Sequence, residues 1–231
     1  MKTIRFPPGL GADQFHGINR PRLGLDSSGQ PVVFKRNRFQ AAAGGQEDGN
    51  ASEVLASRLF VEELGLAGVA VELAVSAEGQ GVVSRFLPGR LSLAEADPAS
   101  VDPLQLAPLV IARDFLGDWD ASTKNYMIGS QGQIEACDFG SSPHKGLPAH
   151  ESGGLIERAV QQFADQRGLD TLLQPFRDLT DRQIEGMVKR AGRGLNPRLQ
   201  KDFIEALVNN RDLLRRSNPY PFVVLAGRPQ V

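Results

Sequence analysis

The first third of the chain alternates short apolar runs with turn residues. Two such runs, RLGL and PVVFK, flank the sequence DSSG at 26–29, and this turn chemistry predicts a β-hairpin over residues 22–36. Two further apolar runs, at 69–75 and 81–87, predict a second pair of strands joined by a turn at 76–80. The N-terminal part is therefore expected to be rich in β-structure.

One helix is expected between these two strand pairs. Apolar residues recur at helical spacing over 54–64, and Gly65 follows as a candidate C-cap. The helix is expected to begin near Asn50 or Ser52. Residues 37–50, which precede it, predict a flexible connector.

The second half of the chain has helical periodicity, interrupted by one short hairpin. Residues 104–116 form a strongly apolar stretch that predicts a helix. Residues 126–128 and 133–137 predict two short strands joined by the turn 129–132. Beyond residue 150 the pattern predicts four more helices, at about 152–167, 169–177, 181–191 and 197–215, with Thr180 as a cap of the third.

This order of elements predicts an α+β fold with two lobes. We expect one domain over residues 1–231, with a small β-rich lobe over about 1–88 and a mostly helical lobe over about 89–231. The polar stretch from Pro88 to Pro103 is expected to join the lobes.

Composition narrows the classes of protein to consider. Hydrophobic residues make up 41% and charged residues 23% of the 231 residues, which favours a packed core over global disorder. The net charge of −1 gives no support for a nucleic-acid-binding surface. The N-terminal sequence lacks the apolar run of a signal peptide, and no run of about 18 apolar residues occurs. We expect a cytoplasmic monomer without stable membrane insertion, or one delivered into a host cell.

The stretch GDWDASTKNYMIGSQGQIEACDFG, at 117–140, contains the most informative residues. Asn125 lies five residues after Asp120, and Asp138 lies thirteen residues after Asn125. Phosphoryl transfer needs oxygen ligands for a metal and a carboxylate that orients the attacking hydroxyl, and these three residues supply both. The intervening hairpin would bring Asn125 and Asp138 to one end. The alternative is that these are ordinary loop residues.

The spacing D-x4-N followed by DFG resembles the catalytic loop and DFG segment of the protein-kinase-like superfamily. The resemblance implies that Asp120 is the base or hydroxyl-orienting residue and that Asn125 and Asp138 bind Mg²⁺. Common kinases have a His-Arg-Asp triplet where this chain has Gly117-Asp118-Trp119, and they place a lysine two residues after the aspartate. Here Lys124 directly precedes Asn125, and no Ala-Pro-Glu follows the DFG.

These departures are more similar to the atypical branches. Those branches include the phosphatidylinositol 3-/4-kinase-like proteins, the actin-fragmin kinases and the HipA-type kinases. The sequences SEVLASRLFVEELGL and VVSRFLPG also resemble bacterial atypical kinases. The resemblance covers roughly residues 15–140, and it implies ATP and Mg²⁺ as cofactors.

The resemblance also implies a nucleotide site upstream. Lys35 would contact the phosphates and pair with Glu53, although Glu62 and Glu63 are alternative partners. Without the downstream cluster, a surface lysine and a glutamate placed by the helix dipole would be the simpler interpretation. Other nucleotide contacts are expected from a phosphate-covering loop with Gly17 and Arg20, and from a hinge formed by Arg85, Phe86 and Leu87. The alternative interpretations are a plain N-terminal loop without a role in phosphate binding, and Phe86 as a core residue.

Several other residues have simpler interpretations. Trp119 is expected to be a packing anchor, with a place at the border of the substrate site as the alternative. Cys137 is expected to be buried and inert. The histidines His16, His144 and His150 lie in loops without metal spacing. Arg211, Arg215 and Arg216 are expected to complement the dipole of the last helix, with a membrane-facing role as the alternative.

The function we predict is that of a minimal bacterial kinase that transfers phosphate from Mg-ATP to Ser or Thr hydroxyls of a protein. Between Ser141 and Glu151 the only basic residue is Lys145, which favours a protein over a lipid acceptor. The alternatives are an inositol-lipid or small-molecule kinase, a pseudokinase that acts as an interaction module, and an adenylyl transferase. The small size is similar to that of bacterial effectors.

Overall fold

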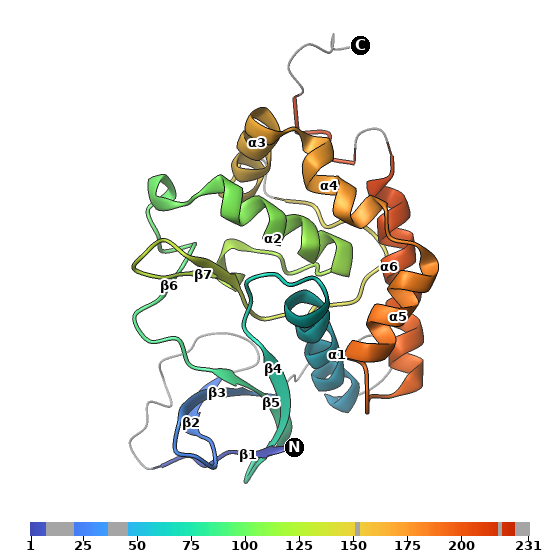
Figure 1. The fold of residues 1–231 in the computed structure, drawn as a ribbon. Helices are drawn as coiled ribbons and strands as arrows, with labels where there is room; N and C mark the ends of the chain where they lie inside the picture. The colour runs from blue at the N-terminus through green and yellow to red at the C-terminus, as the bar shows by residue number, and fades with distance from the viewer. Residues whose placement is uncertain (8–20, 37–45, 151–152, 217–218, 225–231) are drawn as a thin grey trace.

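The structure, a computed structural model, describes residues 1–7, 21–36, 46–150, 153–216 and 219–224. It has a β-rich N-terminal part and a helical C-terminal part (Figure 1). The predicted α+β class is therefore confirmed. Gly17 and Arg20, the residues proposed for a phosphate-covering loop, lie outside the described residues.

The N-terminal part is built on one curled sheet of five strands in the order β1-β4-β5-β3-β2 (Figure 1). The strands are β1 (Lys2–Thr3), β2 (Arg22–Leu25), β3 (Pro31–Lys35), β4 (Val71–Ser76) and β5 (Gly79–Arg85). Neighbouring strands are antiparallel, except that β1 runs parallel to β4. The predicted hairpin at 22–36 is confirmed, and Asp26 closes its turn by accepting hydrogen bonds from the backbone N–H groups of Ser28 and Gln30 at 2.9 and 3.0 Å.

Strand β3 lies beside the central strand β5 and ends at Lys35, which pairs with Val82 of β5. Gly81 of β5 allows this close approach, because a Cβ there would lie 2.4 Å from the carbonyl oxygen of Lys35. Any other residue at 81 would therefore push the two strands apart. The glycine keeps the end of β3, and with it Lys35, against the middle of the sheet.

Helix α1 (Gln46–Arg58) packs on β4 and β5 and continues into a π-helical turn, η1 (Leu59–Glu63). Val54 of this helix is fully buried in a cluster with Val71 and Val82 of the sheet. The helix begins earlier than the sequence predicts, so residues 46–50 are helical and do not belong to a connector. The apolar pattern starts only at residue 54 because the preceding turns bury polar residues, Asn50 and Ser52.

The C-terminal part begins with a small three-stranded sheet in the order β6-β7-β8. Its strands are β6 (Leu91–Ser92), β7 (Tyr126–Ile128) and β8 (Ile134–Ala136). The β7–β8 hairpin confirms the expectation for 126–137. The stretch from Pro88 to Pro103 contributes β6 and a short 3-10 helix, η2 (Pro98–Ser100), so it is partly ordered in the sheet.

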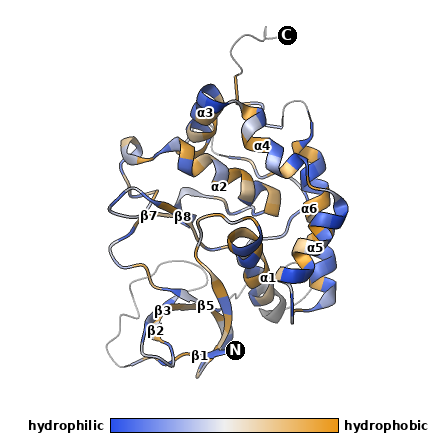
Figure 2. Ribbon diagram, in the orientation of Figure 1, coloured by the Kyte–Doolittle hydropathy of each residue, from blue (hydrophilic) through white to orange (hydrophobic). Residues whose placement is uncertain are grey.

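Helix α2 (Pro103–Leu116) forms the centre of the helical part and contacts α3, α4 and α6. Figure 2 shows α2 as largely hydrophobic, whereas α5 and α6 also carry hydrophilic residues. The surrounding helices are α3 (Leu155–Arg167), α4 (Leu169–Arg177), α5 (Asp181–Ala191) and α6 (Pro197–Leu214). All four were predicted, and Thr180 caps α5 in a capping box with Gln183.

Helix α2 ends at Gly117, whose φ of 67° is in the left-handed region. A Cβ at this position would lie 2.0 Å from the carbonyl oxygen of His144, so two segments cross closely here. The chain consequently leaves α2 at a fixed point and turns into the segment 118–125. In the described part of the chain, no helix combines the length and apolar character needed to cross a membrane.

Candidate active site

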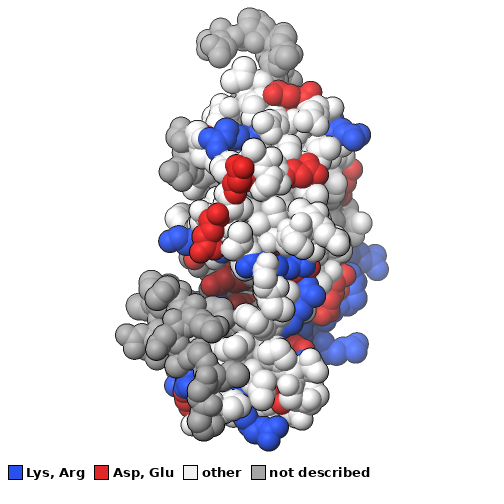
Figure 3. Space-filling model, turned by 90° about the vertical axis from the view of Figure 1, so that its left-hand side faces the viewer, with Lys and Arg blue, Asp and Glu red and all other residues white. Residues whose placement is uncertain are grey.

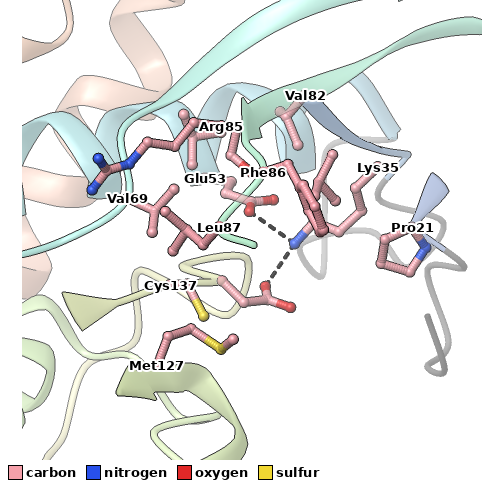
Figure 4. Close-up of a pocket in the computed structure, with 14 residues that line it drawn as sticks. Pro21, Lys35, Glu53, Val69, Val82, Arg85, Phe86, Leu87, Met127 and Cys137 are labelled. Carbon is pink, nitrogen blue, oxygen red and sulfur yellow. Dashed lines mark hydrogen bonds and ion pairs between the residues drawn. The ribbon is translucent and has the colours of Figure 1, made fainter. Parts of the chain in front are cut away.

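Lys35 lies between two carboxylates at the inner end of the cleft between the two parts (Figure 4). Its Nζ is 2.8 Å from Oε1 of Glu53 and 2.6 Å from Oδ1 of Asp138. The Lys35 and Glu53 side chains are only 7% and 3% exposed, whereas that of Asp138 is 41% exposed. The strand β3, the helix α1 and the DFG segment thus meet at one ammonium group.

The charges in this cluster stabilise one another. Burial opposes the charge on Lys35, but the Glu53 and Asp138 carboxylates outweigh burial and raise the pKa of Lys35. Burial likewise opposes the charge on Asp138, but the ammonium of Lys35 outweighs it and lowers the pKa of that carboxyl. Both groups are therefore charged at neutral pH.

The cleft has a volume of about 240 Å³ and walls that are mostly apolar. Its lining residues come from both parts of the molecule (Figure 4): Pro21, Val33, Lys35, Glu53, Val69, Val71, Val82, Ser84, Arg85, Phe86, Leu87, Met127, Cys137 and Asp138. Cys137 is half-buried and lines the cleft, so it is less buried than expected, but desolvation raises the pKa of its thiol to about 12 and keeps the thiol protonated at neutral pH. The geometry suits a flat apolar ring with an anionic tail that points towards Lys35.

The residues at 85–87 leave strand β5 and form the wall of the cleft between the two sheets. The backbone N–H of Phe86 donates to the carbonyl oxygen of Pro31 at 3.4 Å, whereas the amide of Leu87 has no backbone hydrogen bond to any described residue. Arg85 instead reaches across to Glu135 of β8, with an Nη2–Oε2 distance of 2.6 Å, and its side chain is directed away from Lys35 (Figure 4). Residues 85–87 thus line the cleft, while the Arg85 side chain ties the two parts together.

Arg113, near the end of α2, holds the loop and the DFG segment in place. It is fully buried, and its Nη1 donates to the carbonyl oxygens of Asn125 at 3.1 Å and Cys137 at 2.7 Å. Its Nη2 donates to a carboxylate oxygen of Asp118 at 2.5 Å and to the carbonyl of Asp138 at 2.8 Å. One guanidinium therefore fixes both segments that carry the predicted chemistry.

The β7–β8 hairpin brings the two expected metal ligands to its open end. The backbone N–H of Cys137 donates to the carbonyl of Asn125 at 2.9 Å, so Asn125 and Asp138 lie on neighbouring segments. Asp138 has a φ of 54°, a strained conformation for a residue other than glycine. The next residue, Phe139, is fully buried and packs on Phe60 of η1 at a ring-centroid distance of 5.0 Å.

These two residues fit a magnesium ion bound together with a nucleotide. The Nδ2 of Asn125 donates to the carbonyl of Asp120 at 2.5 Å, and among the described residues none donates a hydrogen bond to its Oδ1. That oxygen and the half-exposed carboxylate of Asp138 are hard ligands of the kind that Mg²⁺ takes, with phosphates and water completing its shell. The described residues contain no cluster of three or more His, Cys, Asp and Glu side chains around one point.

Asp120 is exposed and lies outside the cleft that Lys35 lines. It lines a second cavity of about 180 Å³, together with residues 121–123, 148–150 and 154–156. Its backbone is fixed on both sides, because its N–H donates to Oδ1 of Asp118 at 3.2 Å and its carbonyl accepts from Asn125. The Asp120 carboxylate is thus presented to solvent from a rigid loop.

Some expectations for individual residues are wrong. Trp119 is 59% exposed and stands beside His144 at a ring-centroid distance of 5.3 Å, so it is not a packing anchor. It lines the cavity beside Asp120, which agrees with the alternative interpretation. Glu63 pairs with Arg190 at 2.6 Å and is therefore no competitor of Glu53 for Lys35.

The arginines at the end of α6 are also more than dipole partners. Arg211 is 4% exposed, pairs with Asp181 at 2.5 Å and donates to the carbonyl of Leu179 at 3.0 Å. Arg215 donates to the carbonyls of Arg177 and Leu179 at 2.8 and 3.2 Å. Both residues tie α6 to the end of α4, which leaves Arg211 unavailable to a membrane surface.

The sequence reasoning missed Arg113, Asp118 and the contact between Ser52 and Ser142. A charged residue inside the apolar helix at 104–116 was a visible signal for Arg113, since a buried arginine needs several partners. Nothing in the sequence indicates that the Ser52 hydroxyl donates to the carbonyl of Ser142, which ties α1 to the segment after the DFG.

Comparisons with known proteins agree with this geometry at the level of the fold. No protein-family model matches the sequence, and no curated protein is similar to it. Among solved structures, the proinflammatory kinase CtkA of Helicobacter pylori matches with a TM-score of 0.58 at 13% identity, over 90% of this chain and 92% of that one. HipA of Shewanella oneidensis MR-1, in a toxin–antitoxin complex with HipB and operator DNA, matches with a TM-score of 0.48 at 10% identity, over 78% of this chain and 57% of that one. The chain has a kinase-like fold.

Proposed function

We propose that this protein is a phosphotransferase that moves the γ-phosphate of Mg-ATP to a hydroxyl group of a protein. The observation that carries the proposal is the Lys35 ammonium, which contacts Glu53 and Asp138 together at the inner end of an apolar cleft. A nucleotide fits this arrangement, because its ring needs apolar walls and its phosphates need a cation.

Different residues of the chain bind different parts of the nucleotide. Lys35 keeps Glu53 as its buried partner and exchanges Asp138 for a phosphate oxygen. The backbone N–H of Leu87 offers a hydrogen bond to the adenine edge, and Val33, Val71 and Met127 supply apolar contacts. Asn125 and Asp138 would hold the magnesium ion, which neutralises charge on the phosphates when it is bound.

The transfer step needs one further group, which Asp120 supplies. Its carboxylate orients the acceptor hydroxyl and takes its proton as the acceptor oxygen bonds to the γ-phosphorus. The bond from that phosphorus to the β,γ-bridging oxygen breaks, and ADP carries away its electron pair. Asp120 is suited to this role because its loop is fixed by Arg113 and Asp118 while its carboxylate is exposed.

An experiment with two labelled nucleotides tests the proposal. We expect wild-type protein with Mg²⁺ and γ-labelled ATP to label protein in a host lysate, and we expect no label from α-labelled ATP. Asp138→Asn should reduce labelling at least 100-fold, since a metal ligand typically contributes several kcal/mol to the transition state. Asp165→Asn, at an exposed position on α3, is the matched control and should retain wild-type activity.

The other candidate functions give different outcomes in the same experiment. Label from the α-phosphate would select adenylyl transfer, and label in the lipid fraction would select a lipid kinase. ATP-dependent thermal stabilisation without transfer would select a pseudokinase. If wild-type protein neither transfers label nor shows a thermal shift with Mg-ATP, the proposal is wrong.

A further inference from the structure

The cavity of about 180 Å³ beside Asp120 and the cleft of Lys35 have no lining residue in common. One wall is the loop 119–123, and the other is formed by residues 148–150 and the start of α3. On the face that Figure 3 shows, acidic side chains lie recessed where the molecule is narrowest.

We propose that this cavity and the exposed ring of Trp119 form the acceptor site, and that the acceptor is an uncharged or basic polypeptide segment. The inference rests on the proposed function, because it needs a hydroxyl that reaches Asp120. In the acceptor, the residue next to the one that carries this hydroxyl packs its side chain against Trp119. The acceptor backbone lies along the start of α3.

The exposure of Trp119 is the first argument. Large apolar side chains that are this exposed are few among the described residues, and Trp119 is the one that directly precedes Asp120. Exposed tryptophans are frequent anchors of protein interfaces, since a large rigid ring loses little entropy on binding. The ring rests beside His144, so its position is partly fixed before an acceptor arrives.

The charge of the cavity is the second argument. Among the residues that line it, none is Lys or Arg, and Asp120 contributes a carboxylate. The nearby Lys145 is engaged with Glu205 at 2.9 Å. An inositol-phosphate headgroup would need cations here, whereas a neutral or basic peptide does not.

The walls of the cavity are the third argument. The start of α3, from its N-cap Gly154 to Ile156, lines one side of the cavity. On the same side, His150 is held by Asp114, with an Nε2–Oδ2 distance of 3.0 Å. A wall that is fixed in this way can receive an extended polypeptide segment.

A peptide array tests the inference. Its peptides carry one central serine, and a single flanking position is varied among Ala, Leu, Phe, Arg and Glu. We expect wild-type protein to favour Phe or Arg and to disfavour Glu at one flanking position. Trp119→Ala should raise the KM for the favoured peptides about tenfold and abolish this preference. Trp119→Phe should restore most of it.

Two controls separate binding of the acceptor from folding and from the kinase reaction. Trp119→Ala should keep the thermal shift with Mg-ATP, and Leu91→Ala, which removes a side chain that is 53% exposed on β6, should keep the peptide preference. An unchanged peptide preference in Trp119→Ala would refute the acceptor site while the kinase proposal stands. Transfer only to phosphatidylinositol vesicles would also overturn the acceptor site. If wild-type protein labels neither peptides, vesicles nor lysate, both proposals are wrong.

Discussion

At the scale of single residues, the charge balance around Lys35 decides what the cleft can do. Two carboxylates surround one ammonium, so the nucleotide-free site carries an excess of negative charge that a metal ion can neutralise. The Lys35–Glu53 pair is almost completely buried, whereas solvent screens the attraction of Asp138. Glu53 is therefore the stable partner, and Asp138 is the one able to change its contacts.

We predict that Glu53→Gln destabilises the protein and weakens ATP binding. Removing the buried partner leaves the Lys35 ammonium with only the half-exposed carboxylate of Asp138, which costs about 2 kcal/mol. Urea denaturation at pH 7 should show this loss in the free energy of unfolding, and titration with ATP should show a weaker affinity. Glu62→Gln, at an exposed position at the end of the same helix, should change the free energy of unfolding by less than about 0.5 kcal/mol. Equal stability of Glu53→Gln and wild type would contradict the prediction.

At the scale of elements, the ends of strands and helices place the site. Strand β3 delivers Lys35, the middle of α1 delivers Glu53, and the open end of the β7–β8 hairpin delivers Asn125 and Asp138. The C-terminal end of α2 supplies Arg113, which binds the carbonyls of the last two segments. These elements therefore contribute side chains to one small polar network.

Most of these elements could be predicted from the sequence because their signals are local. The turn at 26–29, the glycines at 129–132 and the cap at Thr180 each determine a structure within a few residues. The start of α1 could not be predicted, because its first turns bury polar residues whose partners lie far away in the sequence.

The kinase resemblance indicated the pairing of Lys35 with Glu53, but the contact of Lys35 with Asp138 was not predicted. The two residues are 103 positions apart, and no local pattern connects them. A charged residue in an apolar helix signals that Arg113 has buried partners, but the sequence does not identify them, since most are backbone carbonyls. The exposure of Trp119 depends on how the segments around 117 and 144 cross, which is likewise a property of the tertiary structure.

We predict that Arg113→Lys lowers both stability and turnover. Lysine keeps the charge but lacks the forked donors, so several buried carbonyls and Asp118 lose their hydrogen bonds. We expect the free energy of unfolding to fall by roughly 3 kcal/mol and the kcat of phosphoryl transfer to fall at least tenfold. Arg215→Lys, at the exposed end of α6, is the control and should have little effect on kcat. Wild-type kcat in Arg113→Lys would show that the loop is positioned by other contacts.

At the scale of the whole molecule, the C-terminal segment is tied to the active-site region through Asp114. This carboxylate is fully buried next to Arg113, and one of its oxygens accepts hydrogen bonds from the Tyr220 hydroxyl at 2.7 Å and from His150. The ring of Phe222 packs against both partners. The backbone N–H of Val224 donates to Oε1 of Gln161 on α3 at 2.8 Å, and Nε2 of Gln161 donates to the carbonyl oxygen of Val224 at 3.1 Å. Residues 220–224 thus contact His150, which lines the cavity beside Asp120, and helix α3, whose first residues also line it.

This network predicts a dependence of stability on pH. Burial opposes the charge on His150, but Asp114, with a smaller contribution from Glu157, outweighs burial and raises its pKa. A raised native pKa means that the stabilisation is complete below the unfolded pKa of about 6.5 and is lost as the pH rises through the native pKa. Tyr220, the other hydrogen-bond donor to Asp114, stays neutral over this pH range, because burial and Asp114 raise its pKa well above the ordinary value.

Urea denaturation at pH 6 and at pH 9 measures this contribution. Between these two values the wild type should lose on the order of 1 kcal/mol relative to His150→Gln, whose neutral amide does not titrate. His144→Gln changes the exposed histidine beside Trp119 and should leave the loss in place. Tyr220→Phe should lower stability by about 1 kcal/mol at both pH values, since it removes a buried hydrogen bond without a titrating group. If wild type and His150→Gln change equally with pH, His150 is not charged in the native state, and its hydrogen bond to Asp114 holds the wall as a neutral contact.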